Sequence, residues 1–372
     1  MEEWKEYKLG EVLTIKYGKD HKKLKEGNIP VYGSGGVMRY VNKAISHGPS
    51  LLIPRKGSLN NIIYSPSAFW TVDTMFWTQI NSDIANPLFL YYSICKKDFA
   101  ALNVGTAVPS LTVPVIEDIK ISLPDLDIQS KICAILKSLD DKIELNRKIN
   151  SNLEEQAKAL FKSWFIDFEP FKDGKFVDSE LGKIPEGWNM MSFESFISES
   201  QDKAMVGTYP AYSVTNNGIT PRTEKFKKQL SKATSKEKIL RKDDLVFGMS
   251  RQILNWGVMQ DEIGGVSSAY HVYRIVKERV DPTYLRYFIS GNQSYFRDLI
   301  GTAAREGQSL DKGALMNKKL FVPSEDILQA FIQHITTLEN AVRLFKRQCY
   351  RLSSLRDSLL PRLMSGEIEV RS

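Results

Sequence analysis

The stretch Asn86–Tyr92, NPLFLYY, returns in the second half of the chain as Asp281–Tyr287, DPTYLRY. Ile121–Pro124, ISLP, returns in the same way as Leu320–Pro323, LFVP, and in each half this segment comes just before a long helical pattern. There are two copies, and each is far longer than the repeat unit of a solenoid protein. The sequence therefore predicts a duplicated pair of domains.

Smaller signatures recur in the same order. Trp4 has a counterpart in Trp188, and the tripeptide GTA occurs at residues 105–107 and again at 301–303. A duplicated chain acquires approximate two-fold symmetry, and duplex DNA is a common ligand with matching geometry. The repeat therefore favours a DNA-binding protein.

The composition of the chain agrees with a nucleic-acid partner. Its 372 residues are enough for two or more domains, each with a core of its own. Lys and Arg number 51 against 44 Asp and Glu, which gives a formal net charge of +7. This balance favours a polyanionic partner, although a merely basic soluble protein would have the same composition.

Cysteine usage and hydropathy indicate the compartment. Cys95, Cys133 and Cys349 are far apart and form no CxxC pair, so we expect no metal site, no disulfide framework and a reducing environment. The first residues are charged and lack the apolar core of a signal peptide, and no apolar run reaches membrane-spanning length. These features predict a cytoplasmic protein with no membrane segment.

Two parts of the chain read as strand-rich mixed domains. Residues 1–125 and 188–323 contain short apolar runs separated by clusters of Gly, Pro, Ser and Asn. Asn86 suits the N-cap of a helix in the first domain, with proline at the first helical position, and Asp281 plays that part in the second. Residues 169–187 are rich in turn formers and predict a linker.

The apolar pattern changes to steps of three and four residues at 126–168 and again at 324–372, and each pattern predicts a long helix. The periodic stretches are about 37 residues long, or ~55 Å, which outreaches a small domain. We therefore expect them to pair, although two separate amphipathic helices that cover domain cores are an alternative. Asn146 and Asn150 lie on the apolar seam, where they would cost stability but fix the register.

The fold class that follows is α+β: two similar domains separated by two long helices that form an antiparallel coiled coil, with internal pseudo-two-fold symmetry. The seam is predicted at Ile132, Leu139, Ile143, Leu153, Leu160, Phe331, Ile335, Leu338, Val342, Phe345 and Leu352.

No segment carries the motifs of an enzyme. Residues 86–89, NPLF, are one residue away from the NPPF/Y motif with which amino-methyltransferases hold the target amine. The second proline is missing from both copies, and helix capping explains the Asn and the Pro together. Tyr32–Gly36, YGSGG, lacks the Lys-Ser/Thr ending of a P-loop, so a flexible loop that can approach DNA is favoured. We expect no catalytic residue and no cofactor bound by this chain.

Polar and basic residues recur in loops at matched points of the two domains. Arg55 follows the apolar run Leu51–Ile53, and Arg251 with Gln252 follows Leu245–Gly248. Arg pairs with the edge of guanine, and Gln or Asn with that of adenine. We therefore predict DNA contacts at Tyr32, Ser34, Arg55, Lys56, Ser58, Thr106 and Ser110 in the first domain, and at Thr215, Asn216, Asn217, Arg251, Gln252, Arg305, Gln308 and Ser309 in the second.

Several distinctive stretches are spread in order over nearly the whole chain. They include Gly48–Ser58 (GPSLLIPRKGS), Leu160–Phe168 (LFKSWFIDF), Leu181–Trp188 (LGKIPEGW) and Leu359–Ile368 (LLPRLMSGEI). Together they resemble the specificity subunit of type I restriction–modification systems. The resemblance implies two target-recognition domains, each of which reads one half of a split double-stranded DNA site. It implies a coiled coil that sets the spacing of the half-sites and docks two methyltransferase subunits. Endonuclease–translocase subunits would join through this assembly, and S-adenosylmethionine and ATP would bind only to the partner subunits.

Four apolar residues near the helix ends, Phe161, Trp164, Phe165 and Leu359, exceed what a two-helix seam can cover. Because uncovered apolar surface usually marks an interface, we expect them to contact the methyltransferase subunits. Two other functions remain open. A standalone DNA-modifying enzyme, such as a fused restriction-methyltransferase, would transfer methyl groups as the isolated chain. A coiled-coil scaffold would show no salt-dependent binding to duplex DNA.

Overall fold

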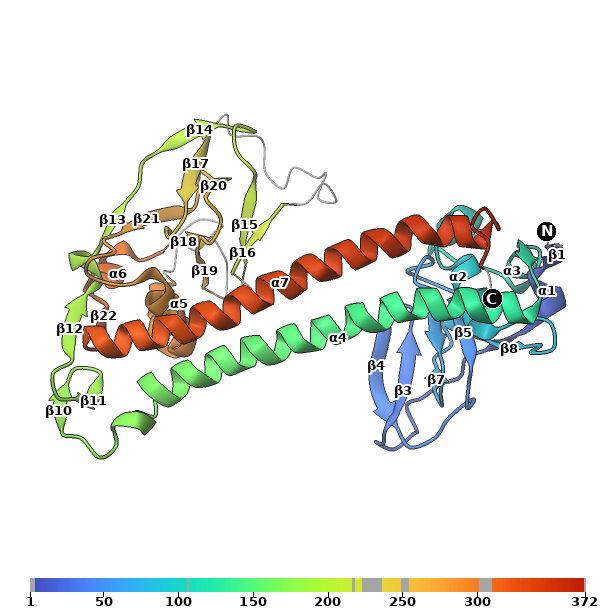
Figure 1. The fold of residues 1–372 in the computed structure, drawn as a ribbon, viewed down its shortest axis with the longest axis horizontal. Helices are drawn as coiled ribbons and strands as arrows, with labels where there is room; N and C mark the ends of the chain where they lie inside the picture. The colour runs from blue at the N-terminus through green and yellow to red at the C-terminus, as the bar shows by residue number, and fades with distance from the viewer. Residues whose placement is uncertain are drawn as a thin grey trace. The chain divides into compact units, whose positions relative to one another are not determined.

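The computed structural model describes residues 4–105, 107–215, 218–222, 236–248, 254–300 and 310–370. The protein is α+β and divides into two compact units (Figure 1). Unit 1 comprises residues 1–148 and 345–372, and unit 2 comprises residues 149–344. Each unit thus holds one mixed domain, the start of the long helix that follows it and the end of the other long helix. The two units are therefore assembled from equivalent segments of the chain, as a duplication would produce.

Unit 1 is built on a four-stranded antiparallel sheet. Its strands, in the order β2-β8-β5-β6, are Leu13–Tyr17, Met75–Ile80, Ser50–Pro54 and Ile63–Ser65. A second sheet has the order β4-β3-β7, with strands Gly36–Val41, Ile29–Gly33 and Trp70–Thr71. The first strand of the chain, β1 (Lys5–Lys8), pairs antiparallel with β9 (Lys120–Leu123), directly before the long helix. Among its described residues the unit also has the short α-helices α1 (Leu9–Val12), α2 (Pro87–Ile94) and α3 (Val113–Glu117).

Unit 2 repeats this topology. Its four-stranded sheet has the order β13-β21-β18-β19, with strands Ile197–Glu199, His271–Ile275, Leu245–Gly248 and Asn255–Val258. The strand after Trp188, β12 (Asn189–Ser192), pairs antiparallel with β22 (Lys319–Val322), as β1 pairs with β9. The helices α5 (Pro282–Gly291) and α6 (Lys312–Asn317) correspond to α2 and α3. The two units therefore share their strand order as well as their sequence signatures.

The second sheet of unit 2 differs from that of unit 1. It has the order β14-β17-β20, with strands Lys203–Met205, Lys236–Arg241 and Ile263–Ser267. Two hairpins accompany the unit: β15 (Tyr212–Thr215) with β16 (Gly218–Pro221), and β10 (Phe176–Ser179) with β11 (Gly182–Pro185). The sequence shows no close repeat over this part of the second domain.

The equivalent helices α2 and α5 begin with the same cap. The Asn86 side-chain oxygen accepts hydrogen bonds from the backbone N–H groups of Leu88 at 2.9 Å and Phe89 at 3.3 Å. Asp281 accepts in the same way from Thr283 at 2.7 Å and Tyr284 at 3.0 Å. Both side chains satisfy orphan donors of a first helical turn, which is the capping role that the sequence indicated.

We expect the Asn86→Ala variant to lose about 1 kcal/mol of the free energy of unfolding, because two N–H groups of α2 lose their acceptor. Urea unfolding followed by circular dichroism measures this loss. Asn86→Asp is the matched control, since Asp caps the equivalent helix in unit 2 and should leave the urea midpoint nearly unchanged. An Ala variant as stable as the wild type would show that the cap contributes nothing.

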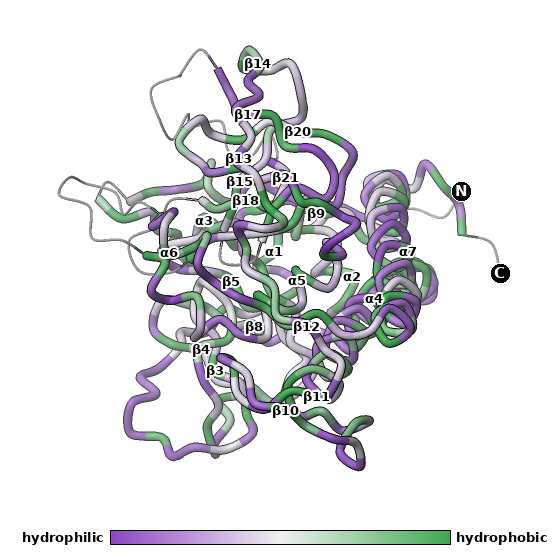
Figure 2. Tube along the Cα trace, turned by 90° about the vertical axis from the view of Figure 1, so that its left-hand side faces the viewer, coloured by the Kyte–Doolittle hydropathy of each residue, from purple (hydrophilic) through white to green (hydrophobic). Residues whose placement is uncertain are grey.

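The two long helices, α4 (Leu126–Phe165) and α7 (Glu325–Met364), are 40 residues each. In unit 1 the Asp140 carboxylate of α4 lies 2.6 Å from the Arg356 guanidinium of α7, and Asn146 Nδ2 donates to Gln348 Oε1 at 3.2 Å. The residue number falls along α7 as it rises along α4, so the helices are antiparallel. In Figure 2 the turns of both helices alternate between hydrophilic and hydrophobic residues, as amphipathic helices do.

The predicted seam residues lie on the covered sides of α4 and α7, but not all against the opposite helix. Ile132 belongs to the core of unit 1 together with Leu360 and Leu363, and Phe331 and Ile335 belong to the core of unit 2. The helix ends therefore pair and also cover the domain cores. Ile143 and Val342 are buried as well, and the others are partly exposed: Leu139, Leu153, Leu160, Leu338, Phe345 and Leu352.

The expectation that apolar residues near the helix ends are uncovered is wrong. Phe161 and Phe165 are only 2% and 1% exposed. The ring centroid of Phe165 lies 4.8 Å from that of Phe331 in α7 and 5.2 Å from that of Tyr284 in α5. Trp164 packs beside them, and Leu359 packs on the core of unit 1. The physical reason is that the domain of each unit covers the helix face that the other helix leaves free.

Candidate nucleic-acid interface

Three loops of unit 1 meet at one edge of the four-stranded sheet: the β3–β4 turn, the loop after β5 and the loop at residues 103–111. The Asn61 side-chain amide donates to the backbone oxygen of Ser34 at 2.8 Å, and Gly57 N–H donates to Pro109 O at 3.1 Å. A Cβ on Gly57, whose φ is +91°, would lie 2.8 Å from Ser34 Oγ. The structure thus brings together the loops that carry Ser34, Ser58 and Ser110.

The backbone of Arg55 and Lys56 is fixed on both sides. Their N–H groups donate to Thr74 O at 2.8 and 3.2 Å, and Arg55 O accepts from Leu111 N–H at 2.9 Å. The backbones of Lys56 and Ser110 also pair as an isolated antiparallel β-bridge. A rigid backbone lowers the entropy lost when the side chains engage a ligand.

Asn103, which the sequence reasoning missed, organises the third loop. Its Oδ1 accepts from Gly105 N–H at 2.9 Å and from Ser110 N–H at 2.8 Å, and its Nδ2 donates to Gly105 O at 2.9 Å. A Cβ on Gly105 would lie 2.2 Å from Val108 O, so the turn requires glycine. An Asn two residues before a repeated Gly is an Asx-turn signature that could have identified it.

An open pocket of about 580 Å³ lies between these loops and is lined by residues that include Ser58, Asn60, Asn61 and Asn103. Its amides already bond within the protein. Asn60 donates to Asp98 at 3.1 Å and accepts from Ala100 N–H at 2.9 Å, while Asn61 reaches Ser34. These asparagine side chains therefore hold the loops together, and the charged donors beside the pocket are those of Arg55 and Lys56.

Arg55 and Lys56 have no carboxylate within ion-pair distance in the part of the chain that the structure describes. One guanidinium N–H of Arg55 donates to Asp73 O at 3.2 Å, and its carbon lies 5.6 Å from the centroid of the Tyr17 ring. Arg carries five N–H donors, so most of them remain for a base edge or a phosphate. The arrangement holds a cation in place without neutralising it.

A second basic segment, Lys16–Lys25 (KYGKDHKKLK), includes Tyr17, whose ring lies near Arg55. Its backbone is tied to the sheet, because Lys19 N–H donates to Thr71 O at 2.9 Å and Trp70 Nε1 donates to Lys19 O at 2.9 Å. Among the described residues, no carboxylate forms an ion pair with its lysines. The sequence reasoning missed this segment, although the charge run itself was a visible signal.

Tyr32 is half-buried rather than freely exposed. Its ring packs beside the buried cluster of Leu52, Phe69 and Met75, and burial raises the pKa of its hydroxyl. The hydroxyl therefore remains protonated at neutral pH. Tyr32 can therefore offer a donor beside these loops while part of its ring packs on the core.

In unit 2, Thr215 ends β15 and its Oγ1 lies 3.3 Å from Gly218 O. The strand β18, which precedes Arg251, lies between β21 and β19 as β5 lies between β8 and β6. The strands β5 and β18 therefore hold equivalent positions in the two sheets. The other predicted contacts lie outside the described residues: Thr106, Asn216, Asn217, Arg251, Gln252, Arg305, Gln308 and Ser309.

The described ranges contain no group of three or more His, Cys, Asp or Glu residues arranged to hold a metal ion. No helix within those ranges is long and apolar enough to cross a membrane.

Comparisons with known proteins agree on one family. Residues 1–155 match the family model described as the type I restriction modification DNA specificity domain. The chain is 26% identical over 366 residues to the specificity subunit of the type I restriction enzyme MjaIX of Methanocaldococcus jannaschii, which covers 91% of this chain and 84% of that protein. It is 31% identical over 199 residues to the HindI specificity subunit of Haemophilus influenzae, which covers 46% of this chain and 43% of that one.

The fold is similar to that of a solved structure. A crystal structure of the S subunit of a type I restriction–modification system from M. genitalium aligns with a TM-score of 0.62 over 100% of this chain and 97% of that chain. The identity is 13%, so this likeness concerns the fold alone.

Proposed function

We propose that this chain, which belongs to the family of type I restriction–modification specificity subunits, is the sequence-specific DNA-binding subunit of such a system. The domains at residues 1–125 and 188–323 would each read one half of a bipartite site. The observation that supports this most is the repeated topology. The same strand order occurs in each domain, and in the sequence Arg55 follows β5 as Arg251 follows β18.

The chemistry of the first domain supports a division between positioning and reading. Lys56 and the lysines of Lys16–Lys25 are point charges suited to phosphate oxygens, which carry no sequence information. The planar guanidinium of Arg55 suits the paired acceptors of a guanine edge. Two such readers held on one chain recognise a split site.

The chain itself is a recognition component, and we assign the chemistry to partners. Methyltransferase subunits, two per specificity subunit, would dock on the helices α4 and α7, and endonuclease–translocase subunits would join through that assembly. S-adenosylmethionine and ATP would bind to these partners. The setting would be the cytoplasm, where the host DNA lies.

The test is to map methylated bases across the host genome with and without this gene. We expect a motif of two short half-sites, separated by a fixed number of unspecified base pairs, to lose methylation when the gene is deleted. The purified chain alone, incubated with duplex DNA and S-adenosylmethionine, should transfer no methyl groups. Unchanged methylation in the deletion strain, or methyl transfer by the isolated chain, would contradict the proposal.

A further inference from the structure

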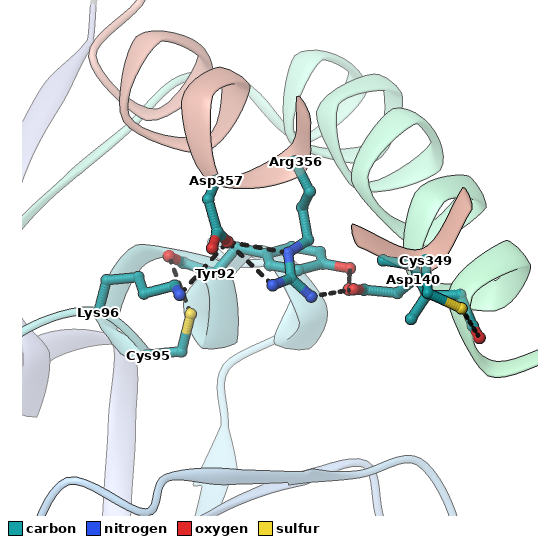
Figure 3. A network of polar contacts seen from close by, with 8 residues as sticks. Tyr92, Cys95, Lys96, Asp140, Cys349, Arg356 and Asp357 are labelled. Carbon is teal, nitrogen blue, oxygen red and sulfur yellow. Dashed lines mark hydrogen bonds and ion pairs between the residues drawn. The ribbon is translucent and has the colours of Figure 1, made fainter. Parts of the chain in front are cut away.

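In unit 1 a partly buried network of polar contacts joins the domain helix α2 to both long helices (Figure 3). The Tyr92 hydroxyl donates to Asp140 Oδ2 in α4 at 2.7 Å. The other oxygen of that carboxylate accepts from Arg356 in α7 at 2.6 Å. Arg356 also donates to Asp357 at 2.9 Å, and Lys96, just after α2, lies 3.3 Å from Asp357. One carboxylate thus receives bonds from the domain and from the second helix.

Unit 2 contains an equivalent set of residues. The Tyr287 hydroxyl in α5 donates to Glu339 Oε1 in α7 at 3.1 Å, and Arg286 pairs with the same carboxylate. The residues of the two sets also occupy equivalent positions in the sequence. Tyr92 and Tyr287 are each the sixth residue after the N-cap of their helix, and Asp140 and Glu339 each lie 16 residues after the proline that precedes their long helix.

The source of the guanidinium differs between the two units. Counted from the start of each long helix, the residue of α4 that corresponds to Arg356 is Ala157, which is buried in the core of unit 2. Arg286 of α5 supplies the charge there instead, with its carbon 4.9 Å from the centroid of the Tyr287 ring. Each unit therefore contains a tyrosine hydroxyl that donates to a carboxylate of a long helix, and an arginine that pairs with the same carboxylate. The arginine comes from α7 in unit 1 and from α5 in unit 2.

We propose that Tyr92–Asp140–Arg356 and Tyr287–Glu339–Arg286 are two equivalent latches that fix the orientation of each recognition domain on the long helix that follows it, and thereby fix the spacer length that the protein accepts between half-sites. The inference rests on the proposed function. The four charged side chains are 18–33% exposed, so their bonds are partly shielded from water.

Directional bonds suit this role better than the surrounding core does. The apolar contacts of α2 and α5 are non-directional and roughly proportional to area, so a small rotation costs them little. A hydrogen bond weakens steeply with misalignment, and one to a charged group is about twice as strong as a neutral one. Burial raises the pKa of Tyr92 and of Tyr287, and the adjacent carboxylate raises it further, so both hydroxyls remain donors.

The test measures the affinity of the full-length protein for duplexes that carry both half-sites with the preferred spacer or with one base pair more or fewer. A wrong spacer requires a domain to turn on its helix, which breaks the latch. The spacer penalty is the ratio of the affinity for the preferred spacer to the affinity for the altered one. In Tyr92→Phe and Tyr287→Phe no latch has to break, so this ratio should fall about tenfold, the equivalent of one charge-assisted hydrogen bond. Affinity for the preferred spacer and base preference within each half-site should stay the same.

Two tyrosines provide matched controls. Tyr91 lies beside Tyr92, and the described residues show no hydrogen bond from its hydroxyl to a long helix. Tyr284 donates to Phe321 O at 2.6 Å inside its own domain. Tyr91→Phe and Tyr284→Phe should keep the full spacer penalty, even where the second lowers the thermal midpoint. Glu339→Gln, which keeps an acceptor but loses the charge, should reduce the penalty by a smaller factor.

The outcomes separate the two proposals. A wild-type protein without preference for a split site would remove the proposed function. The latch alone would be overturned if the wild-type protein selects one spacer and the latch variants, which must still melt cooperatively, select that spacer equally sharply. The latch would also be overturned if Tyr284→Phe reduced the spacer penalty as much as Tyr287→Phe does, because general destabilisation would then explain both.

Discussion

Replacing Phe165 with Ala should lower the free energy of unfolding of unit 2 by about 3–5 kcal/mol, the usual cost of removing a large aromatic side chain from a core. Phe165 is 1% exposed, and its ring packs against rings from α5, α7 and the segment before β12. The centroid distances are 4.8 Å to Phe331, 5.2 Å to Tyr284 and 5.7 Å to Trp188. Its loss would leave a cavity where α4, α7 and the domain meet.

Urea unfolding monitored by tryptophan fluorescence measures the effect, because Trp164 and Trp188 pack in the same cluster. Leu344→Ala is the matched control: this residue lies on α7 in the same unit but is 54% exposed. Its loss should change the free energy of unfolding by less than about 0.5 kcal/mol. Equal effects of the two substitutions would mean that the aromatic cluster does not hold unit 2 together.

This result would also change how assembly experiments are interpreted. A Phe165 or Trp164 variant that fails to co-purify with methyltransferase subunits would report an unfolded unit 2 rather than a lost contact. Subunit docking is better probed at positions that the chain leaves uncovered. Leu145 in α4 and Tyr350 in α7 are exposed, and both belong to unit 1.

The features predicted from sequence were those with local or repeated signals. The duplication, the long helices and the caps of α2 and α5 follow from residues such as Asn86 and Asp281, whose role depends on their immediate neighbours. The apolar periodicity of α4 and α7 was informative in the same way. Periodicity reports that a helix face is buried, however, and not what buries it.

That difference explains the error at Phe161 and Phe165. The sequence shows that these apolar residues exceed a two-helix seam, but the domain that covers them folds from residues far along the chain, such as Tyr284 and Phe288. The latches were missed for a related reason. Asp140 and Glu339 look like solvated helix positions in sequence, and only the tertiary structure places a tyrosine hydroxyl against each of them.

The interface loops show how far residue types alone can lead. Arg55 and Lys56 were proposed because Arg and Lys suit bases and phosphates, and the structure shows their backbone held between Thr74 and Leu111. Asn103 acts on this loop through three backbone contacts rather than through a ligand. Its role depends on a fold that brings residues 55–57 and 105–110 together, which no sequence window spans.

Arg55→Ala should relax base preference in one half-site only, the half read by the first domain, by roughly 1–3 kcal/mol of discrimination. One N–H of the Arg55 guanidinium donates to Asp73 O, and the guanidinium lies near the Tyr17 ring. Its remaining N–H groups can therefore form a bidentate pair with a base edge. Arg55→Lys is the matched control, because it keeps the charge but loses the planar fork. It should lose the discrimination and keep the salt dependence of binding.

Lys56→Ala should act differently, because a point charge on phosphate carries no sequence information. We expect affinity to fall about equally for all duplexes, with the slope of log affinity against log salt reduced by about one. Methylation motifs mapped for each variant complex, together with salt titrations of duplex binding, separate the two roles. Because the readers are separate domains, effects of Arg55 and of Arg251 or Gln252 should be nearly additive. A change at Arg251 that altered the half-site read by the first domain would show that two independent readers do not exist.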